Sequence, residues 1–320
     1  MKRLVKKEGF GNVQLVEDNV PVPGKGEFLV KLTRSLISRG SELFRRYVRE
    51  EAVDPQIMGY SAVGRVAELG PETAGIETGQ RVVVTAPHAQ FELSTLYGDR
   101  RRAFPLPDSI SDEEATFLHL AAESLMWMRS TPVAETDTVV VLGQGIIGAL
   151  CAQTVRERQP ARVIAVDLLP LRCEISAKLG ADIVVDGSKV DPVETVLQLT
   201  DGASADVVVE CVGGPAGVKS FAMAQKILKR GGIIQLVARY QGEPLPLDAT
   251  SLAGGMVLFG DRLNHTYREC KQDAAAMIVD GRLRVRELIT HRLPWQEVAD
   301  AYHFLYQHPE EALGVILEWE

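Results

Sequence analysis

Cysteine is scarce in this 320-residue chain, and its spacing does not suit metal or disulfide sites. The four cysteines are Cys151, Cys173, Cys211 and Cys270, and no two of them form a Cys-x-x-Cys pair. Zinc ribbons and disulfide frameworks both need closely spaced or multiple cysteines, so neither is expected. The absence of cysteine before Cys151 also bears on the metal question below.

A basic excess and a long apolar run are missing as well. The formal net charge is −8 and the isoelectric point is about 5.4. We therefore expect no nucleic-acid partner, which would normally bind a basic surface. No run approaches the roughly 18 apolar residues of a membrane span. The basic start Met1–Lys7 is followed by no apolar stretch, unlike a signal peptide, so we expect a cytoplasmic protein.

The composition is that of a globular protein large enough for two domains, with 46% hydrophobic residues. Residues 1–125 are β-rich, with short apolar runs at 28–32, 64–69 and 81–84 bounded by Gly and Pro. They predict a small barrel or sandwich of antiparallel strands. A helix is expected to begin at Ser111 and to continue to Met128, because acidic residues follow a serine N-cap there.

Residues 126–262 change to an alternation of strands and helices. Helical segments at 171–179 and 218–228 separate apolar runs at 139–142, 162–166, 183–185, 207–209 and 233–237. Such βα units predict a doubly wound parallel sheet, so the fold class is α/β. The final segment, residues 263–320, contains a helix near 269–280 and an apolar strand at 313–317.

One glycine-rich loop indicates a nucleotide site. The sequence Gly143-Gln144-Gly145-Ile146-Ile147-Gly148 follows a buried strand and opens a helix. In that context Gly-x-Gly-x-x-Gly is typical of a dinucleotide-binding loop. The first glycine allows the tight turn, the second admits the pyrophosphate to the backbone, and the third lets the helix pack closely. The helix N-terminus then stabilises the phosphate charge.

The end of the next strand indicates which cofactor binds. Asp167 lies 19 residues after Gly148, where a carboxylate can accept hydrogen bonds from ribose hydroxyls and would repel a 2′-phosphate. NAD(H) is therefore favoured over NADP(H). Arg172 favours NADP(H) instead, because a basic residue at that position can hold a 2′-phosphate. Leu168, Val212 and Val237 also lie at strand ends and are assigned to the cofactor site; sheet packing is their alternative role.

The order of these segments resembles the medium-chain dehydrogenase/reductase superfamily, the relatives of zinc alcohol dehydrogenases. The resemblance covers essentially the whole chain. It implies a GroES-like catalytic domain, a Rossmann coenzyme domain, and a chain that returns to the first domain in 263–320. Besides the glycine loop, it rests on Gly59-Tyr60-Ser61-Ala62-Val63-Gly64-Arg65-Val66, Gly79-Gln80-Arg81-Val82, Lys178-Leu179-Gly180-Ala181-Asp182 and Ile289-Thr290-His291-Arg292-Leu293-Pro294.

A narrower resemblance lies in Ile37-Ser38-Arg39-Gly40-Ser41-Glu42 together with Gly59-Tyr60-Ser61. These segments are similar to the branch that includes bacteriochlorophyllide a dehydrogenase, which oxidises a secondary alcohol on a chlorin side chain. That branch also contains many enzymes without an assigned substrate.

The zinc ligands of the family are mostly replaced in this sequence. By the resemblance, Ser38 or Arg39 stands in place of the family's cysteine ligand, Tyr60 in place of its histidine, and His119 at the third ligand position. Zinc needs about three protein ligands drawn from thiolate, imidazole and carboxylate, and a serine hydroxyl and a phenol are poor substitutes. The cysteine-rich structural lobe is absent too. We therefore expect no zinc and no metal ligands.

Without a metal, side chains must handle the alcohol proton. The candidates are Tyr60 or His119 as acid/base, with Ser38 or Ser41 orienting the substrate oxygen or relaying the proton. Ser41 aligns with the relay hydroxyl of the family. Packing of Tyr60 in the former metal cavity, with His119 bonded to a backbone carbonyl, is the alternative. His88 is assigned a structural role in preference to a catalytic one.

The sequence thus predicts an NAD(H)-dependent oxidoreductase that interconverts a secondary alcohol and a ketone by hydride transfer without zinc. One alternative is a metal-free enone or quinone reductase; another is a non-catalytic NAD(H) sensor or assembly protein. An anionic substrate is an alternative to a neutral one, because Arg45, Arg46 and Arg49 and the run Arg100-Arg101-Arg102 are basic in an acidic chain. The apolar strand 255–260 leads us to expect a homodimer, since the family's matching edge strand pairs between subunits.

Overall fold

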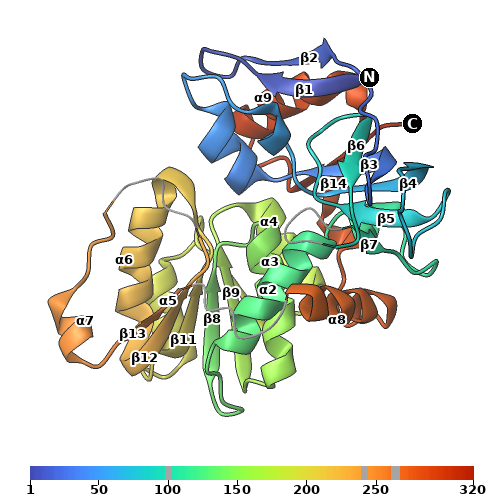
Figure 1. Cartoon of the computed structure of the whole chain (residues 1–320). Coiled ribbons are helices and arrows are strands. Elements are labelled where there is room, and N and C mark those ends of the chain that lie inside the picture. Colours follow the sequence, from blue (N-terminus) through green and yellow to red (C-terminus); the bar gives the residue numbers. More distant parts are fainter. Residues whose placement is uncertain (98–102, 239–243, 261–266) are drawn as a thin grey trace. The chain divides into compact units, whose positions relative to one another are not determined.

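The computed structural model describes residues 1–97, 103–238, 244–260 and 267–320, so Arg100, Arg101 and Arg102 lie outside the described residues (Figure 1). The chain divides into two compact units. Unit 1 comprises Met1–His119 and Ile289–Glu320, and unit 2 comprises Leu120–Leu288. The α/β fold class predicted from the sequence is confirmed.

The return to unit 1 begins later than the expected residue 263. Helix α8 (Tyr267–Val279) and the chain up to Leu288 stay with unit 2. An ion pair between Arg129 NH1 and Asp273 Oδ2 at 2.5 Å holds α8 there. The backbone N–H of Arg284 also donates to Gln153 Oε1 at 2.8 Å. These contacts, which join segments far apart in the chain, explain the difference from the expected boundary.

Unit 1 is built on a mainly antiparallel sheet with the strand order β14-β15-β3-β4-β5-β7, and β6 also pairs with β3. Strands β1 and β2 form a separate antiparallel pair, and β14 runs parallel to β15. The strands are β1 (Lys2–Lys6), β2 (Val13–Glu17), β3 (Phe28–Ile37), β4 (Ala62–Leu69), β5 (Arg81–Val84), β6 (Phe91–Ser94), β7 (Phe104–Pro105), β14 (Ile289–Pro294) and β15 (Gly314–Glu318).

Short helices complete unit 1, and its returning segment contributes to the core. Tyr302 of α9 and Trp319 are buried in the same apolar cluster as Phe28 of β3. The described helices are η1 (Arg39–Tyr47), which is wound as a π-helix, η2 (Pro55–Ile57), α1 (Asp112–Ala115), η6 (Trp295–Glu297) and α9 (Val298–Gln307).

The helix expected over 111–128 is two helices, α1 and α2 (Leu118–Ser130). Ser111 is the N-cap that the sequence suggested, and the structure shows that it forms a capping box with Glu114. The interruption lies at Thr116, whose carbonyl accepts a hydrogen bond from the Ser61 hydroxyl and whose own hydroxyl donates to the carbonyl of Glu113 at 2.7 Å. Side-chain bonds of this kind compete with the helical pattern.

Unit 2 is a parallel six-stranded sheet with the order β10-β9-β8-β11-β12-β13. Alternate residues of its central strands enter two apolar clusters, one with residues of α2 and α3 and the other with residues of α5 and α6. Successive strand residues point to opposite faces, so both faces are buried, as continuous apolar runs predict. The strands are β8 (Thr138–Leu142), β9 (Arg162–Asp167), β10 (Ile183–Asp186), β11 (Ala205–Glu210), β12 (Leu228–Leu236) and β13 (Val257–Phe259).

Most helices of unit 2 lie between its strands in the sequence, whereas α2 precedes β8, and α8 and η5 follow β13 (Figure 1). They are α3 (Ile146–Thr154), η3 (Val155–Arg158), α4 (Pro170–Lys178), α5 (Pro192–Leu199), η4 (Gly214–Ala216), α6 (Gly217–Ile227), α7 (Ala249–Ala253) and η5 (Arg286–Leu288), in addition to α2 and α8. Within the described ranges, no helix has the length and apolar character needed to cross a membrane.

Candidate active site

The glycine loop of unit 2 has the geometry of a tight strand-to-helix turn. Gly143 follows β8 with φ at +83°, and its N–H donates to the carbonyl of Val166 at 2.8 Å. A Cβ on Gly148 would lie 1.7 Å from the carbonyl oxygen of Gly143, so only glycine fits there. A Cβ on Gly145 would meet no atom within 4 Å. The loop is therefore closed on its protein side and approachable at Gly145, as a pyrophosphate requires.

Helix α3 begins without a side-chain cap, which leaves its first N–H groups for a ligand. Gly145 is the N-cap in an extended conformation. The side chain of Gln144 is buried: its Nε2 donates to the carbonyl of Val141, and its Oε1 accepts from the Ser176 hydroxyl, each at 2.9 Å. The side chain of Gln144, like its N–H, which donates to Asp167 Oδ2 at 2.6 Å, is therefore already bonded within the protein. Uncapped N–H groups at a helix start favour phosphate.

Asp167 ends β9 beside this loop, and its carboxylate is held by backbone N–H groups. Oδ1 accepts from Leu168 and Leu169 at 2.7 and 2.9 Å. Oδ2 accepts from Gln144 at 2.6 Å and lies 3.7 Å from NH1 of Arg172. Three N–H bonds leave acceptor capacity mainly on Oδ2, where a ribose hydroxyl could bind. The structure thus brings Asp167 to the glycine loop and Arg172 to Asp167.

The remaining predicted cofactor residues lie around the same strand ends. Ile146 is buried, Ile147 is half-buried in a core cluster, and Leu168 is exposed. The ends of β11 and β12 are tied together by Glu210, a residue that the sequence reading did not single out. Its carboxylate accepts from the N–H of Val212, and its carbonyl accepts from the N–H of Val237, each at 3.0 Å. A buried acidic residue at a strand end is the only sequence signal that could have indicated it.

Three segments that carry the predicted catalytic residues meet in unit 1. The N–H of Leu36, just before Ser38, donates to the carbonyl of Ser61 at 2.9 Å. The Ser61 hydroxyl donates to the carbonyl of Thr116, in the turn that leads to His119. Ser61 directly follows Tyr60. These bonds join the backbones beside Ser38, Tyr60 and His119, which are far apart in the sequence.

The four predicted catalytic side chains differ in exposure. Ser38 and His119 are buried, whereas Ser41 and Tyr60 are half-buried. Ser38 is the N-cap of η1, and Ser41 lies in its first turn. The sequence reading did not foresee a helix over Arg39–Tyr47. Three arginines in this stretch obscure its apolar side, where Leu43 and Tyr47 are buried.

A buried polar network beside this segment was also missed. Glu42 is fully buried, and its carboxylate accepts from the N–H of Ser38 at 2.8 Å, from His88 Nε2 at 2.9 Å, and from the Tyr302 hydroxyl. Burial raises the pKa of the Glu42 carboxyl, but His88 and these hydrogen bonds lower it more, so the net shift is downward. Burial and the nearby Glu42 charge raise the pKa of Tyr302 well above its usual value.

The side chains at the family's zinc-ligand positions do not form a zinc donor set. Arg39 is one of the two candidates for the cysteine position, and its guanidinium donates to the carbonyl of Pro309 at 3.3 Å and lies over the ring of Phe44. A guanidinium stays protonated and has no acceptor. Glu42, the nearby carboxylate, already accepts three hydrogen bonds. All four cysteines lie in unit 2.

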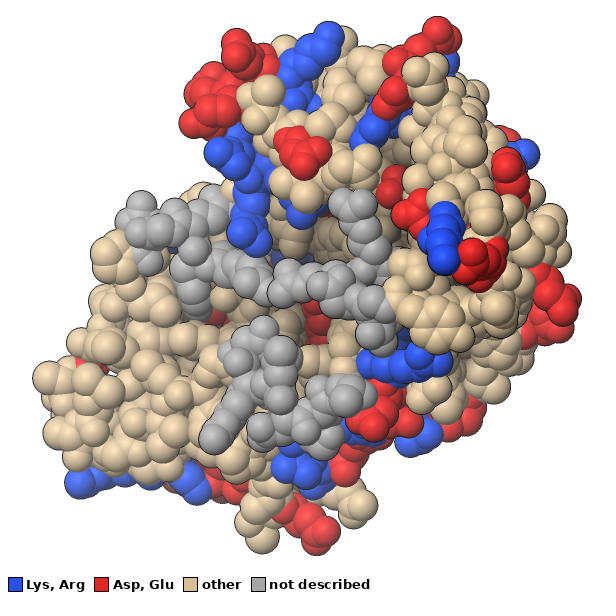
Figure 2. All heavy atoms as spheres, viewed as in Figure 1, with Lys and Arg blue, Asp and Glu red and all other residues tan. Residues whose placement is uncertain are grey.

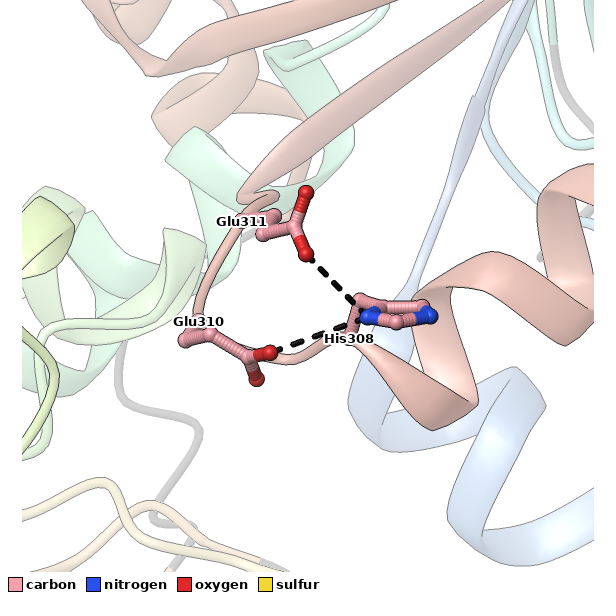
Figure 3. Close-up of side chains that lie close together, drawn as sticks. All are labelled: His308, Glu310 and Glu311. Carbon is pink, nitrogen blue, oxygen red and sulfur yellow. Dashed lines mark ion pairs between the residues drawn. The ribbon is translucent and has the colours of Figure 1, made fainter.

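Elsewhere in the described ranges, one group of three metal-ligating side chains comes together, and it is exposed. His308, Glu310 and Glu311 follow α9, with Nδ1 of His308 at 3.7 Å from Glu310 and 3.1 Å from Glu311 (Figure 3). These are surface ion pairs around one imidazole, and such pairs contribute little to stability. The group includes none of the predicted catalytic residues.

Charge is mixed on the surface. On the face shown in Figure 2, Lys and Arg are interspersed with Asp and Glu. Arg45 of η1 and Arg49, which follows η1, are exposed, and Arg49 pairs with Glu51 at 3.3 Å. Arg46 donates to the carbonyl of Ile57. Arg46 and Arg49 are therefore already bonded to other residues of the protein. Arg45 is the exposed arginine closest in sequence to Ser41.

Comparisons with known proteins agree with this architecture. Residues 147–279 match the family described as zinc-binding dehydrogenase. The L-threonine 3-dehydrogenase of Pyrococcus horikoshii is 26% identical over 89% of both chains. An oxidoreductase/dehydrogenase of unknown specificity from Escherichia coli has a TM-score of 0.84 at 19% identity over 99% of both chains. A zinc-binding dehydrogenase from Sinorhizobium meliloti, solved with NADP, has a TM-score of 0.83 at 20% identity over 99% of both chains.

The family match covers much of unit 2, and the relatives extend it over both units with the same succession of a β-rich part, a parallel sheet and a returning tail. The expected superfamily is thereby confirmed. Over most of its length the chain is thus similar to zinc-type alcohol dehydrogenases and related oxidoreductases, and its residues 147–279 match the zinc-binding dehydrogenase family.

Proposed function

We propose that this protein is an NAD(H)-dependent oxidoreductase that interconverts a secondary alcohol and a ketone by hydride transfer. The observation that carries the proposal is the glycine loop, open at Gly145 and placed beside the fixed carboxylate of Asp167. The L-threonine 3-dehydrogenase relative supports the substrate class, because C3 of threonine is a secondary carbinol.

The residues proposed to bind the cofactor lie in unit 2, and those proposed to act on the alcohol lie in unit 1. The N-terminus of α3 and the backbone at Gly145 bind the pyrophosphate, and Asp167 binds a ribose hydroxyl. A bound NAD would supply the hydride acceptor for oxidation of the carbinol carbon, and NADH the hydride donor for the reverse reaction. Tyr60 or His119 takes the hydroxyl proton in the same direction and returns it when the ketone is reduced. Ser38 or Ser41 orients the substrate oxygen through its hydroxyl.

We further propose that this reaction proceeds without catalytic zinc. The argument rests on the chemistry of the side chains: a serine or an arginine, a phenol and a single imidazole at the ligand positions. The test is elemental analysis of protein purified without chelator or affinity metal. We expect less than about 0.1 zinc per chain; about one zinc per chain would contradict the zinc-free mechanism and identify a ligand set that includes His119.

The catalytic assignment is tested by a double variant, Tyr60→Phe with His119→Ala. Loss of a general acid/base costs about 100- to 10,000-fold in turnover. We expect such a loss with little change in NADH affinity, measured by fluorescence titration. Turnover equal to that of the parent would reject both residues. The substrate panel should pair secondary alcohols with enones and quinones, because a preference for the latter would instead support a metal-free reductase.

The substrate itself is a finer proposal. Arg45 is exposed one helical turn from Ser41 on η1, which would suit an alcohol carrying a carboxylate or phosphate. The narrower sequence resemblance instead suggests an alcohol on a chlorin side chain. Comparing 3-hydroxybutyrate with its neutral amide tests the first idea, since equal kcat/KM for the two would remove the case for an anionic substrate.

We also propose that the protein is a homodimer. Strand β13 pairs with β12 on one side, and its Val257 and Leu258 are 41% and 37% exposed. An exposed apolar edge strand is a template for pairing with a second strand. Light scattering should give about twice the monomer mass of 35.0 kDa. A Val257→Lys variant should shift the protein toward the monomer, and an unchanged dimer would place the interface elsewhere.

A further inference from the structure

The buried carboxylate of Glu42 has a role that its packing alone does not explain. We propose that Glu42 is a positioning residue that fixes the start of η1, and through it the hydroxyls of Ser38 and Ser41, for the reaction. The inference rests on the proposed function for what those hydroxyls do, and on the contacts of Glu42 for how they are held.

The first step is the capping of η1. An N-cap serine normally uses its hydroxyl to accept a backbone N–H of the first turn. Ser38 makes no such side-chain cap bond. Instead, the N–H of Glu42 donates to the carbonyl of Ser38, and the N–H of Ser38 donates to Glu42 Oε1, both at 2.8 Å. This reciprocal pair closes the helix start with the Glu42 side chain, so the Ser38 hydroxyl is not needed as a cap.

The second step is how the carboxylate is itself held. Oε2 of Glu42 accepts from His88 Nε2 at 2.9 Å and from the Tyr302 hydroxyl. The other ring nitrogen of His88 bonds the Ser35 hydroxyl at 2.8 Å, and that hydroxyl accepts from Trp319 Nε1 at 2.8 Å. Tyr302, which is 260 residues from Glu42 in the sequence, thus bonds its carboxylate directly, and Trp319 joins the same network through Ser35 and His88.

The third step is energetic. A fully buried carboxylate is retained only when it is paired and hydrogen-bonded, and even then an apolar replacement is often equally stable. Stability alone therefore gives little reason for a buried Glu–His pair with satisfied partners. What an apolar residue could not supply is the acceptor that holds the N–H of Ser38. Reacting groups misplaced by about 1 Å cost on the order of 100-fold in rate, which gives this acceptor a functional value.

The test compares Glu42→Gln and Glu42→Asp with Lys6→Met. Asp keeps the charge beside His88 but is one methylene too short to keep all three bonds; it also replaces the Gln variant should that one not fold. Lys6 is a matched control: it is buried in the same unit, and its ammonium donates to the carbonyls of Lys7, Gly9 and Glu51. All three variants should lower the melting temperature.

We expect the Glu42 variants to lower kcat by about 10- to 100-fold with KM and the Kd of NADH changed less than about twofold. Lys6→Met should leave kcat unchanged. Glu42 variants that melt earlier but keep the parent kcat and KM would show a purely structural role and overturn the proposal.

A second readout does not depend on the proposed activity. Hydrogen–deuterium exchange of a peptide covering residues 37–44 should become faster in Glu42→Asp, while a peptide covering 139–151 and the Lys6→Met protein stay as in the parent. If the parent oxidises no alcohol, the proposed function fails while this exchange result still tests the positioning. Unchanged protection of 37–44 in Glu42→Asp would overturn the positioning whatever the activity.

Discussion

The nucleotide loop of unit 2 and the start of η1 in unit 1 are both sites of fixed geometry, but they are fixed by different means. The geometry of the loop is fixed by the close contact between the backbones of Gly148 and Gly143, which leaves no room for a Cβ on Gly148. The start of η1 is determined by a side chain, Glu42, held by His88 and Tyr302. The first arrangement uses six consecutive residues, whereas the second uses residues from distant parts of the chain.

This difference explains why one functional site can be predicted from the sequence and the other cannot. A loop made by consecutive residues can be recognised in the sequence, because its geometry requires particular residue types at fixed spacings. A network of side chains from distant parts of the chain leaves no recognisable spacing in the sequence, because its members meet only when unit 1 folds. The following experiments test whether the two sites are as independent and as differently constructed as this comparison suggests.

The largest effect is expected for Gly148→Ala. Its Cβ would lie 1.7 Å from the Gly143 carbonyl, so the loop must open and NADH binding should be lost. The cost should reach or exceed the upper end of the roughly 1–3 kcal/mol typical of overpacking. Thermal unfolding and NADH fluorescence titration measure both effects.

The matched control is Gly145→Ala, where a Cβ meets no protein atom within 4 Å. It should fold with a stability within about 0.5 kcal/mol of the parent, yet bind NADH more weakly because the methyl group faces the pyrophosphate. Equal NADH affinity in both glycine variants would contradict the backbone-approach account of the loop.

The next largest effect is expected for His88→Leu in unit 1. His88 Nε2 is a hydrogen-bond partner of the buried Glu42 carboxylate at 2.9 Å, and removing one partner of a buried carboxylate costs about 3–5 kcal/mol because the carboxylate stays buried without that contact. Urea unfolding measures the loss, and NADH affinity should be retained because the cofactor loop lies in unit 2.

The control for that variant is His291→Leu, a half-buried histidine bonded to the Thr290 hydroxyl at 3.0 Å. It should cost about 1 kcal/mol or less. A similar small cost for both histidines would mean that Glu42 does not depend on His88.

Lys271, a buried charged residue of unit 2, makes the stability of the protein depend on pH and provides a further test of how a buried charge is held. Burial lowers the pKa of Lys271 from its usual 10.5 to about 8, although Glu123 raises it in part. Between pH 8 and 10.5 the unfolded chain binds more protons at this site, so the stability of the parent rises with pH across that window. Below pH 8 the buried ammonium destabilises the fold.

Lys271→Met should therefore be more stable than the parent at pH 7, by roughly 2–3 kcal/mol, since each pKa unit corresponds to about 1.4 kcal/mol. The advantage should shrink as the pH rises through 8 toward 10.5. Urea titrations at several pH values measure it. A constant difference between the two proteins would show that this lysine is not destabilising by its charge.

The smallest effect is expected for Asp167→Asn. The carboxylate should lose a charge-assisted hydrogen bond to the ribose, which is worth about 1.5–3 kcal/mol, or about tenfold or more in NAD affinity. NADP affinity should rise relative to NAD because the repelling charge is gone and Arg172 remains nearby. Asp186→Asn, at the end of the neighbouring strand β10, should change neither; the same shift there would reject a specific role for Asp167.

The sequence predicted the glycine loop, the strand before it and the parallel sheet of unit 2, because buried strands and Gly-x-Gly-x-x-Gly are local patterns. It also located the helix N-cap at Ser111. It missed η1, whose arginines obscure its apolar side, and the break at Thr116, which depends on a hydroxyl from Ser61. The continuation of unit 2 to Leu288 was missed for the same reason, since Arg129 and Asp273 are 144 residues apart.

The amino-acid sequence by itself thus determined the fold class and the glycine loop, since each is a matter of residue type at a local spacing. The tertiary structure alone decided that Ser61 would join the segments of Ser38 and His119, and that Glu42 would meet His88 and Tyr302. Glu42 lies on η1, Tyr302 on α9, and His88 between β5 and β6. Hydrogen bonds between such distant side chains form only when the helices, strands and loops that carry them pack together, which no local spacing in the sequence records.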